Sequence, residues 1–170
     1  MEKTLPEAEQ KQKKIKQRLD FILQECRMVL PGIQALFGFQ LIVVFNDRFF
    51  SIPSGDRLVH LAAILFIVAS VGLLMGPAAY HRLASPDELP PELCKIGTRL
   101  VCLGMATLMI SISLEIYLVT KLILDNPLAG IISGATTFIF LSIIWYVFPL
   151  INRRGEHHQH SIERSTPVLM

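Results

Sequence analysis

Four long stretches of apolar residues, separated by short polar connections, restrict the folds that this chain can adopt. The clearest stretch is Leu58–Tyr80, LVHLAAILFIVASVGLLMGPAAY. A helix needs about 20 apolar residues to cross the hydrocarbon core of a bilayer, so this stretch is long enough to span a membrane. The chain of 170 residues is 52% hydrophobic, which leaves too little polar surface for a soluble domain of this size. We therefore predict an all-α, polytopic membrane protein.

The pattern predicts four transmembrane helices in an antiparallel bundle, preceded by an N-terminal amphipathic helix. Only Asp125, Asn126 and Pro127 separate the third span from the fourth, so these two helices are expected to be antiparallel neighbours. The spans are expected at about 28–45, 58–80, 96–124 and 128–151. They form a transmembrane domain at 21–151, between a cytoplasmic basic segment at 1–20 and a cytoplasmic polar tail at 152–170.

The first 20 residues are rich in lysine and lack the apolar core and small-residue cleavage site of a signal peptide. Ile15, Leu19, Ile22 and Cys26 recur at i, i+4, i+7 and i+11, which predicts a basic amphipathic helix with one apolar stripe. Two interpretations stand equally: the helix lies on the membrane surface and binds anionic lipid, or it is a solvated tail that keeps the N-terminus inside.

Lysine and arginine are distributed unequally between the two sides of the predicted membrane domain. Thirteen fall in the N-terminal segment, the connection after the second span and the C-terminal tail, against three on the other side, at Arg48, Arg57 and Lys121. Because basic residues favour the cytoplasmic side, both termini are expected in the cytoplasm. The net charge of +2 is too small to suggest a nucleic-acid partner.

Glu115, in MISISLEIYLVTK, is the residue of the predicted spans that most needs an explanation. An acid at the centre of a membrane helix costs about 2.5–3.5 kcal/mol, and a carboxylate facing lipid is rare. Glu115 is therefore expected to point into the bundle. The helical stripe that it shares contains Gly104, Leu108, Ser111 and Leu118.

Other polar residues are predicted at depths close to that of Glu115. At about 1.5 Å per residue, Gln40 lies nearer the outer face and Gln34 nearer the inner one, so the first span is expected to give one or both amides to the carboxyl group. His60 is expected near the outer rim, where it would meet Lys121 or Asp125. The candidates for an ion or proton pathway are Glu115, Gln40, Gln34, His60 and Ser111, with Glu25 and Arg99 at the inner end.

Two functional interpretations of these polar residues remain open. Ionisable residues inside a membrane commonly mark proton or ion pathways, which favours proton-coupled movement of a small cation. Alternatively, the polar residues are interhelical hydrogen bonds worth about 0.6 kcal/mol each, in a non-catalytic membrane subunit or scaffold that binds a partner protein or anionic lipid. The sequence has no Gly-rich phosphate loop, nucleophile elbow or HExxH, so no enzyme is predicted.

Two pairs of glycines show the four-residue spacing that lets membrane helices approach closely. One pair is Gly72 and Gly76 in the second span, and the other is Gly130 and Gly134 in the fourth. Packing inside one bundle is favoured over a homodimer face, although a homo-oligomer remains open.

No metal or cofactor is predicted. His157, His158 and His160 lie in the short polar tail, and a metal needs ligands that are held in place by supporting contacts. The three cysteines, Cys26, Cys94 and Cys102, are odd in number and lack the spacing of metal ligands.

Three segments of the sequence carry a family resemblance. They are ECRMVLPGIQALFGFQL at Glu25–Leu41, PAAYHR at Pro77–Arg82 and WYVFPLINR at Trp145–Arg153. The chain resembles, over about Leu19–Arg154, a family of small bacterial integral membrane proteins that is grouped as a domain of unknown function. The resemblance implies a bacterial inner-membrane protein. Some members carry an automatic label of sodium:proton antiporter, which extends to this chain as a hint of ion transport.

Overall fold

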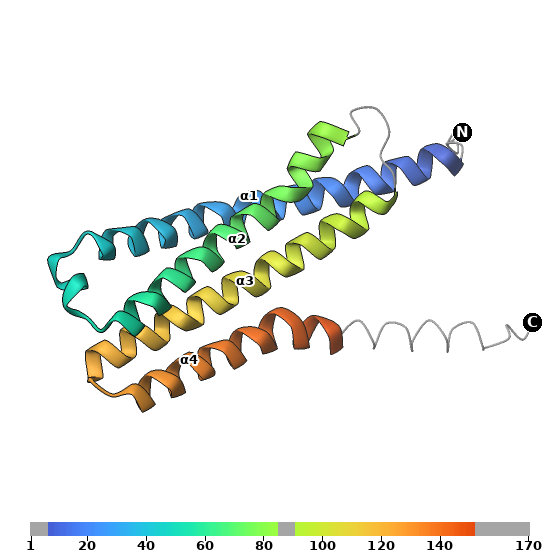
Figure 1. Ribbon diagram of the computed structural model, residues 1–170. Helices are drawn as coiled ribbons and strands as arrows, with labels where there is room; N and C mark the ends of the chain where they lie inside the picture. Colours follow the sequence, from blue (N-terminus) through green and yellow to red (C-terminus); the bar gives the residue numbers. More distant parts are fainter. Residues whose placement is uncertain (1–6, 85–90, 152–170) are drawn as a thin grey trace, which may run out of the picture.

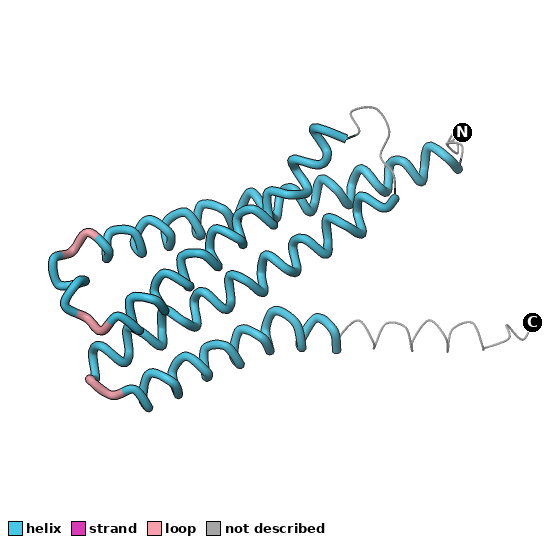
Figure 2. The backbone as a smooth tube through the Cα atoms, in the orientation of Figure 1, coloured by secondary structure: helices cyan, strands magenta, loops and turns pink. Residues whose placement is uncertain are grey.

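The computed structural model describes residues 7–84 and 91–151, and these ranges are helical with no strand. The helices are α1 (Glu7–Val44), α2 (Ser54–Ala84), α3 (Pro91–Leu124) and α4 (Pro127–Ser142). A short 3₁₀ helix, η1 (Asp47–Ser51), follows α1, and a π-helical segment, η2 (Ile143–Val147), continues α4 (Figure 2). The predicted all-α fold is therefore confirmed.

Within the described ranges, four helices are long and apolar enough to cross a membrane, which confirms the predicted number of spans. Their apolar segments are Gln12–Val44, Ser54–Tyr80, Lys95–Leu124 and Pro127–Ile151. Figure 1 shows the helices side by side, with η1 and the α3–α4 turn at one end, here called the connection end. The first residue of α1 and the last residues of α2 and η2 lie toward the opposite end, here called the terminal end (Figure 1).

α1 is one continuous helix that passes through Pro31 and joins the basic N-terminal segment to the first span. The apolar stripe predicted from the sequence is partly buried inside the protein, with Leu19 at 2% and Cys26 at 4% exposure. Ile33 continues the buried face at 3% exposure. Cys26 and Ile33 belong to the hydrophobic core of the bundle, so the C-terminal part of the stripe is used for packing between helices.

Hydrogen bonds from serine hydroxyls join α2 to α3. Ser70 Oγ donates to the carbonyl oxygen of Gly104 at 2.8 Å, and Ser111 Oγ donates to that of Ala63 at 2.7 Å. A Cβ atom on Gly104 would lie 2.9 Å from Leu74 Cγ, so the glycine is what permits this close approach. The seam between α2 and α3 therefore combines close packing with two buried hydrogen bonds.

A tight turn makes α3 and α4 neighbours, as the sequence predicted. Asp125 adopts a left-handed conformation with φ 47°, and the N–H of Asn126 donates to the carbonyl oxygen of Lys121 at 3.3 Å, which closes the end of α3. Asn126 then caps α4, because its Oδ1 accepts from the N–H of Leu128 at 2.9 Å. Pro127 occupies the first turn of α4, where no N–H is needed.

The two glycine pairs differ in their surroundings. A Cβ atom on Gly130 would lie 2.8 Å from Tyr117 O, and one on Gly134 would lie 3.0 Å from Ser113 O, so this pair sits in the seam between α4 and α3. Gly72 faces open space, with nothing within 4 Å of its Cβ position. Gly76 does lie in a close contact, since a Cβ atom there would lie 2.9 Å from Leu100 Cδ1 of α3. Close packing against α3 thus involves Gly76 of α2 as well as both glycines of the α4 pair.

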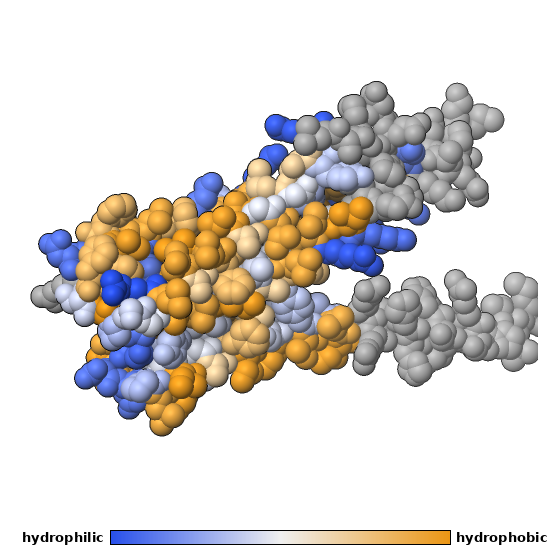
Figure 3. Space-filling model, viewed as in Figure 1, coloured by the Kyte–Doolittle hydropathy of each residue, from blue (hydrophilic) through white to orange (hydrophobic). Residues whose placement is uncertain are grey.

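The outer surface of the helices is largely apolar, as the orange atoms over the bundle in Figure 3 show. On α4, the hydroxyls of Ser133, Thr137 and Ser142 donate to carbonyl oxygens of the same helix. In hydrocarbon such groups must be satisfied within the protein, so this surface fits a bilayer. The length of the four helices and their apolar surface are compatible with a membrane protein.

Three predicted features lie outside the described residues. They are the tail histidines His157, His158 and His160, the first six residues, and residues 85–90 of the loop between α2 and α3.

Candidate functional site

Glu115 lies on the buried stripe of α3 that the sequence predicted. Leu108 and Leu118 are 7% and 3% exposed, and Ser111 is fully buried at 0%. The side chain of Glu115 itself is 16% exposed. The predicted inward orientation of this carboxyl group is therefore confirmed.

Gln40 of α1 contacts Glu115 directly. Gln40 Nε2 donates to Glu115 Oε1 at 2.8 Å, and Gln40 is only 4% exposed. The prediction that the first span gives an amide to this carboxyl group is confirmed for Gln40. Gln34 lies on the exposed face of α1 instead.

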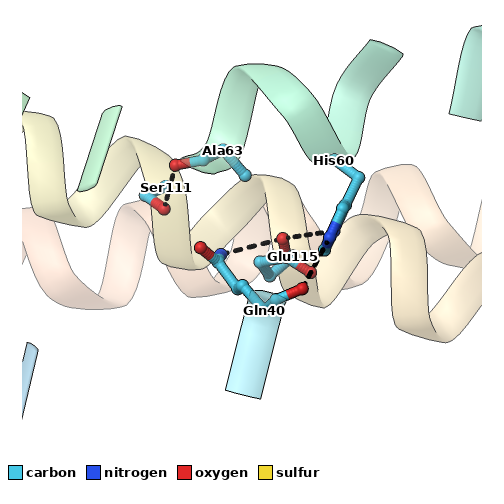
Figure 4. A network of polar contacts seen from close by, with 5 residues as sticks. All are labelled: Gln40, His60, Ala63, Ser111 and Glu115. Atoms are coloured by element: carbon cyan, nitrogen blue, oxygen red, sulfur yellow. Dashed lines mark hydrogen bonds and ion pairs between the residues drawn. The ribbon is translucent and has the colours of Figure 1, made fainter. Parts of the chain in front are cut away.

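His60 of α2 completes a cluster that joins three helices (Figure 4). His60 Nδ1 lies 2.9 Å from Glu115 Oε1, and His60 Nε2 lies 3.1 Å from the backbone oxygen of Gln40. His60 is 1% exposed, so its imidazole is buried inside the protein, away from solvent and lipid. We call Gln40, His60 and Glu115 the polar cluster.

The geometry of the polar cluster fixes where protons can reside. A backbone carbonyl oxygen can only accept, so His60 Nε2 must carry the proton that it shares with Gln40 O. His60 Nδ1 then faces Glu115 Oε1 at ion-pair distance, although it makes no hydrogen bond of good geometry among the described residues. A proton on one of these two atoms makes the contact attractive, and without it a lone pair faces a carboxylate. The pair is thus arranged to hold one exchangeable proton.

The sequence-based expectation that His60 meets Lys121 or Asp125 is wrong. Lys121 Nζ instead pairs with Asp56 Oδ1 at 2.5 Å. The reason is that α2 begins at Ser54, one helical turn before the predicted start of the second span at residue 58. His60 therefore lies about 9 Å from the start of its helix and reaches the depth of Glu115.

Asp56 and Phe49 lie at the connection end, and neither was predicted as a site residue from the sequence. The rings of Phe49 and His60 are 5.3 Å apart and make an edge contact at 61°, so η1 covers the imidazole from the connection end. Asp56 is 4% exposed and precedes His60 by four residues, which places both on one face of α2. That spacing is the signal that was available in the sequence.

Two buried side-chain oxygen atoms near the connection end have no hydrogen-bond partner among the described residues. They are Gln40 Oε1 and Asp56 Oδ2. Figure 4 shows the side-chain oxygen of Gln40 pointing away from Glu115. Buried acceptors are normally satisfied, so these two atoms are suited to water or to a small cation.

The remaining pathway candidates do not extend the polar cluster to the terminal end. The hydroxyl of Ser111 donates a hydrogen bond to the backbone oxygen of Ala63, so it joins α3 to α2. Glu25 and Arg99 are exposed. The buried core toward the terminal end consists of Cys26, Ile33, Ile67, Leu74, Val101 and Leu108.

No group of three or more His, Cys, Asp or Glu side chains that would hold a metal ion occurs among residues 7–84 and 91–151. Cys26 and Cys102 are free thiols. The site therefore offers a proton-binding pair and oxygen acceptors.

A protein-family model matches residues 8–149, which is most of the chain. Its description is a family of unknown function, DUF6328. No curated protein and no solved structure matches the chain.

Proposed function

This chain belongs to the family of unknown function DUF6328, and we propose that it couples the binding of a proton at His60 and Glu115 to the movement of a small cation across a membrane. The single observation behind this proposal is the Nδ1–Oε1 contact of 2.9 Å within the polar cluster. It joins the imidazole and the carboxyl group of two different helices inside an apolar span. Such a pair is a common proton carrier in membrane transport.

The proposed setting is an antiparallel four-helix bundle in a bacterial inner membrane, with both termini in the cytoplasm and the N-terminal part of α1 as a basic helix. The excess of lysine and arginine at the terminal end supports this orientation. Lys121, on the other side, has its charge offset by Asp56. In this orientation the polar cluster lies nearer the outer face than the cytoplasmic one.

Protonation acts on the packing of three helices at once. Oε1 of Glu115 contacts both Gln40 of α1 and His60 of α2, so loss of the shared proton turns one of these two contacts repulsive. Charges interact strongly where the effective dielectric constant is low. The resulting repulsion is the force that we propose to open the cluster.

The oxygen acceptors supply the proposed cation ligands. Carboxylate and carbonyl oxygens are the ligands that hard cations prefer, and the cluster contains the Glu115 carboxylate and the unpartnered Oε1 of Gln40. A cation would replace the proton as the positive charge beside Glu115. Exchange of one for the other at a single carboxylate is the basis of the proposed coupling.

The apolar core toward the terminal end sets a condition on this proposal. A cation leaving the polar cluster for the cytoplasm meets Ile67 and Leu74, which are 0% and 2% exposed. The proposed movement therefore needs a second arrangement of the helices in which this part of the bundle separates.

The experiment is a flux measurement on purified protein in liposomes that contain a pH-sensitive dye. A sodium gradient, and separately a potassium gradient, is imposed on the parent protein and on Glu115→Gln. In the parent, protons are expected to move in the direction opposite to the cation. Glu115→Gln is expected to lose that movement, because an amide does not take up and release a proton as a carboxylate does.

Gln34→Leu is the matched control, because Gln34 lies on the exposed face of the helix that also carries Gln40. It should keep the flux of the parent, whereas Gln40→Leu should reduce it. Absence of cation-driven proton movement in the parent, or an unchanged rate in Glu115→Gln, would refute the proposal.

A membrane subunit or scaffold is the second candidate, and two observations favour it. The N-terminal part of α1 exposes Lys13, Lys14, Lys16 and Arg18, and α4 packs chiefly against α3, so its other side is exposed. The basic surface suits anionic lipid or an acidic partner protein. Affinity purification of the intact protein from membranes tests this candidate, because it requires a partner in stoichiometric amount.

A further inference from the structure

A cavity of about 150 Å³ lies toward the terminal end, away from the polar cluster. Its walls come from four elements: Val29 of α1, Leu74 of α2, Val101 and Met105 of α3, and Trp145 of η2. Glu25 is the one charged residue among those that line it. The cavity is therefore a largely apolar space that is partly open to the surroundings.

The wall residues from α2, α3 and η2 lie at similar distances from the ends of their apolar spans. Leu74 is six residues before Tyr80, Val101 six after Lys95 and Trp145 six before Ile151, where these three apolar spans end. Six residues of helix correspond to about 9 Å. The cavity thus sits at the level of the hydrocarbon chains of one leaflet.

The π-helical segment η2 supplies Trp145 to the wall of the cavity. The N–H of Phe148 donates to the carbonyl oxygen of Ile143, five residues earlier, and Tyr146 Oη donates to the carbonyl oxygen of Cys102 at 2.6 Å. This second bond ties η2 to α3. Trp145 packs against the buried core, whereas Ile144 and Val147 are exposed. Isolated π turns within α-helices are frequent at functional sites.

Water is a poor occupant for this cavity. An ordered water needs two to four polar partners, which the apolar residues that make up most of this lining do not supply. In a bilayer the hydrocarbon available at this depth is lipid chain. We propose that the cavity holds a segment of the acyl chain of a membrane phospholipid, lodged between α1, α3 and Trp145. This site is independent of the proposed proton and cation chemistry.

The test fills the cavity and counts bound lipid. The full-length parent and Val101→Phe are purified in mild detergent, and native mass spectrometry measures the phospholipid that remains bound to each. The parent is expected to retain one phospholipid per chain. In Val101→Phe the lipid-bound fraction should fall about tenfold or more, because the aromatic ring occupies the space of the acyl chain.

Val68→Phe is the matched control, since Val68 is 52% exposed on the outer surface of α2 and should retain lipid as the parent does. Val29→Phe is a second filling variant. Val29 is 38% exposed, so a larger ring is accommodated there more easily than at Val101. A parent without retained phospholipid would overturn the proposal. Equal retention by Val68→Phe and by a folded filling variant would overturn it as well.

Fluorescence gives an independent readout, because Trp145 is the only tryptophan of the chain. The parent is loaded with phospholipid whose acyl chains carry bromine, which quenches tryptophan, and is then washed with unlabelled detergent. After the wash, the fluorescence of Trp145 should remain quenched in the parent and in Val68→Phe. In the filling variants the fluorescence should recover. Complete reversal of quenching in the parent would show that Trp145 meets only exchangeable lipid, and would contradict the site.

Discussion

The two ends of the helix bundle are held together in different ways. Near the connection end, buried polar groups join α1, α2 and α3 through Glu115, and glycines bring α4 against α3. Near the terminal end, the core is apolar and contains a cavity of about 150 Å³. Helix association in lipid depends on close packing and hydrogen bonds, since the hydrophobic effect no longer separates helix from solvent. The connection end therefore joins three helices through one carboxyl group, whereas the terminal end ties η2 to α3 through the Tyr146 hydroxyl and leaves room for another molecule.

The largest expected effect comes from removing the carboxyl group that joins three helices at the connection end. Glu115→Leu leaves Gln40 Nε2 and His60 Nδ1 buried without their shared partner, and each such group costs about 1–3 kcal/mol. The free energy of unfolding should fall by about 2–5 kcal/mol. Titration with a denaturing detergent, followed by circular dichroism, measures this change.

Ile116→Leu is the control for that prediction, because Ile116 is the next residue and is 38% exposed. Its unfolding free energy should stay within about 0.5 kcal/mol of the parent. An equally small change in Glu115→Leu would mean that the polar cluster does not hold the connection end together.

The next largest effect is expected from bulk added to the seam between α3 and α4. In Gly130→Val the new Cβ would meet the backbone oxygen of Tyr117 at 2.8 Å, so the helices must separate at a cost of about 1–3 kcal/mol. Gly72→Val places the same side chain in open space and should change the stability by less than about 0.5 kcal/mol. The same detergent titration compares them, and similar losses in both would remove the distinction between these two glycines.

The smallest effect is expected at the turn that closes the connection end. Asp125 has a φ of 47°, which glycine adopts without steric cost, so Asp125→Gly should stabilise the protein by about 0.5–1 kcal/mol. Asn126→Ala should act in the opposite direction, because it removes the cap of α4 at a cost of about 0.5–2 kcal/mol. Thermal unfolding in detergent micelles distinguishes the signs, and a loss of stability in Asp125→Gly would contradict the account of this turn.

The sequence predicts those features that follow from the physics of a single span. Apolar length predicts four spans, and the cost of a carboxylate in lipid predicts that Glu115 faces inward. Depth along a helix then predicts the contact with Gln40. Each of these inferences needs only a residue type and its distance from a helix end.

Features that depend on how one helix starts or rotates against another were not predicted. The partner of His60 was assigned wrongly because polar residues before Leu58 hid the first turn of α2. Nothing in IIWYV signals a π turn at Ile143–Val147, since the i→i+5 bonds leave the apolar pattern unchanged. The cavity beside Trp145 is likewise a property of packing between helices.

The turn between α3 and α4 also bears on how the chain enters the bilayer during synthesis. The left-handed conformation of Asp125 and the hydrogen bonds of Asn126 close this turn from within, and α4 packs chiefly against α3. The last two spans are therefore equipped to leave the translocation machinery together as a helical hairpin. In that case the N-terminal spans need not be in place before the C-terminal pair acquires its final geometry.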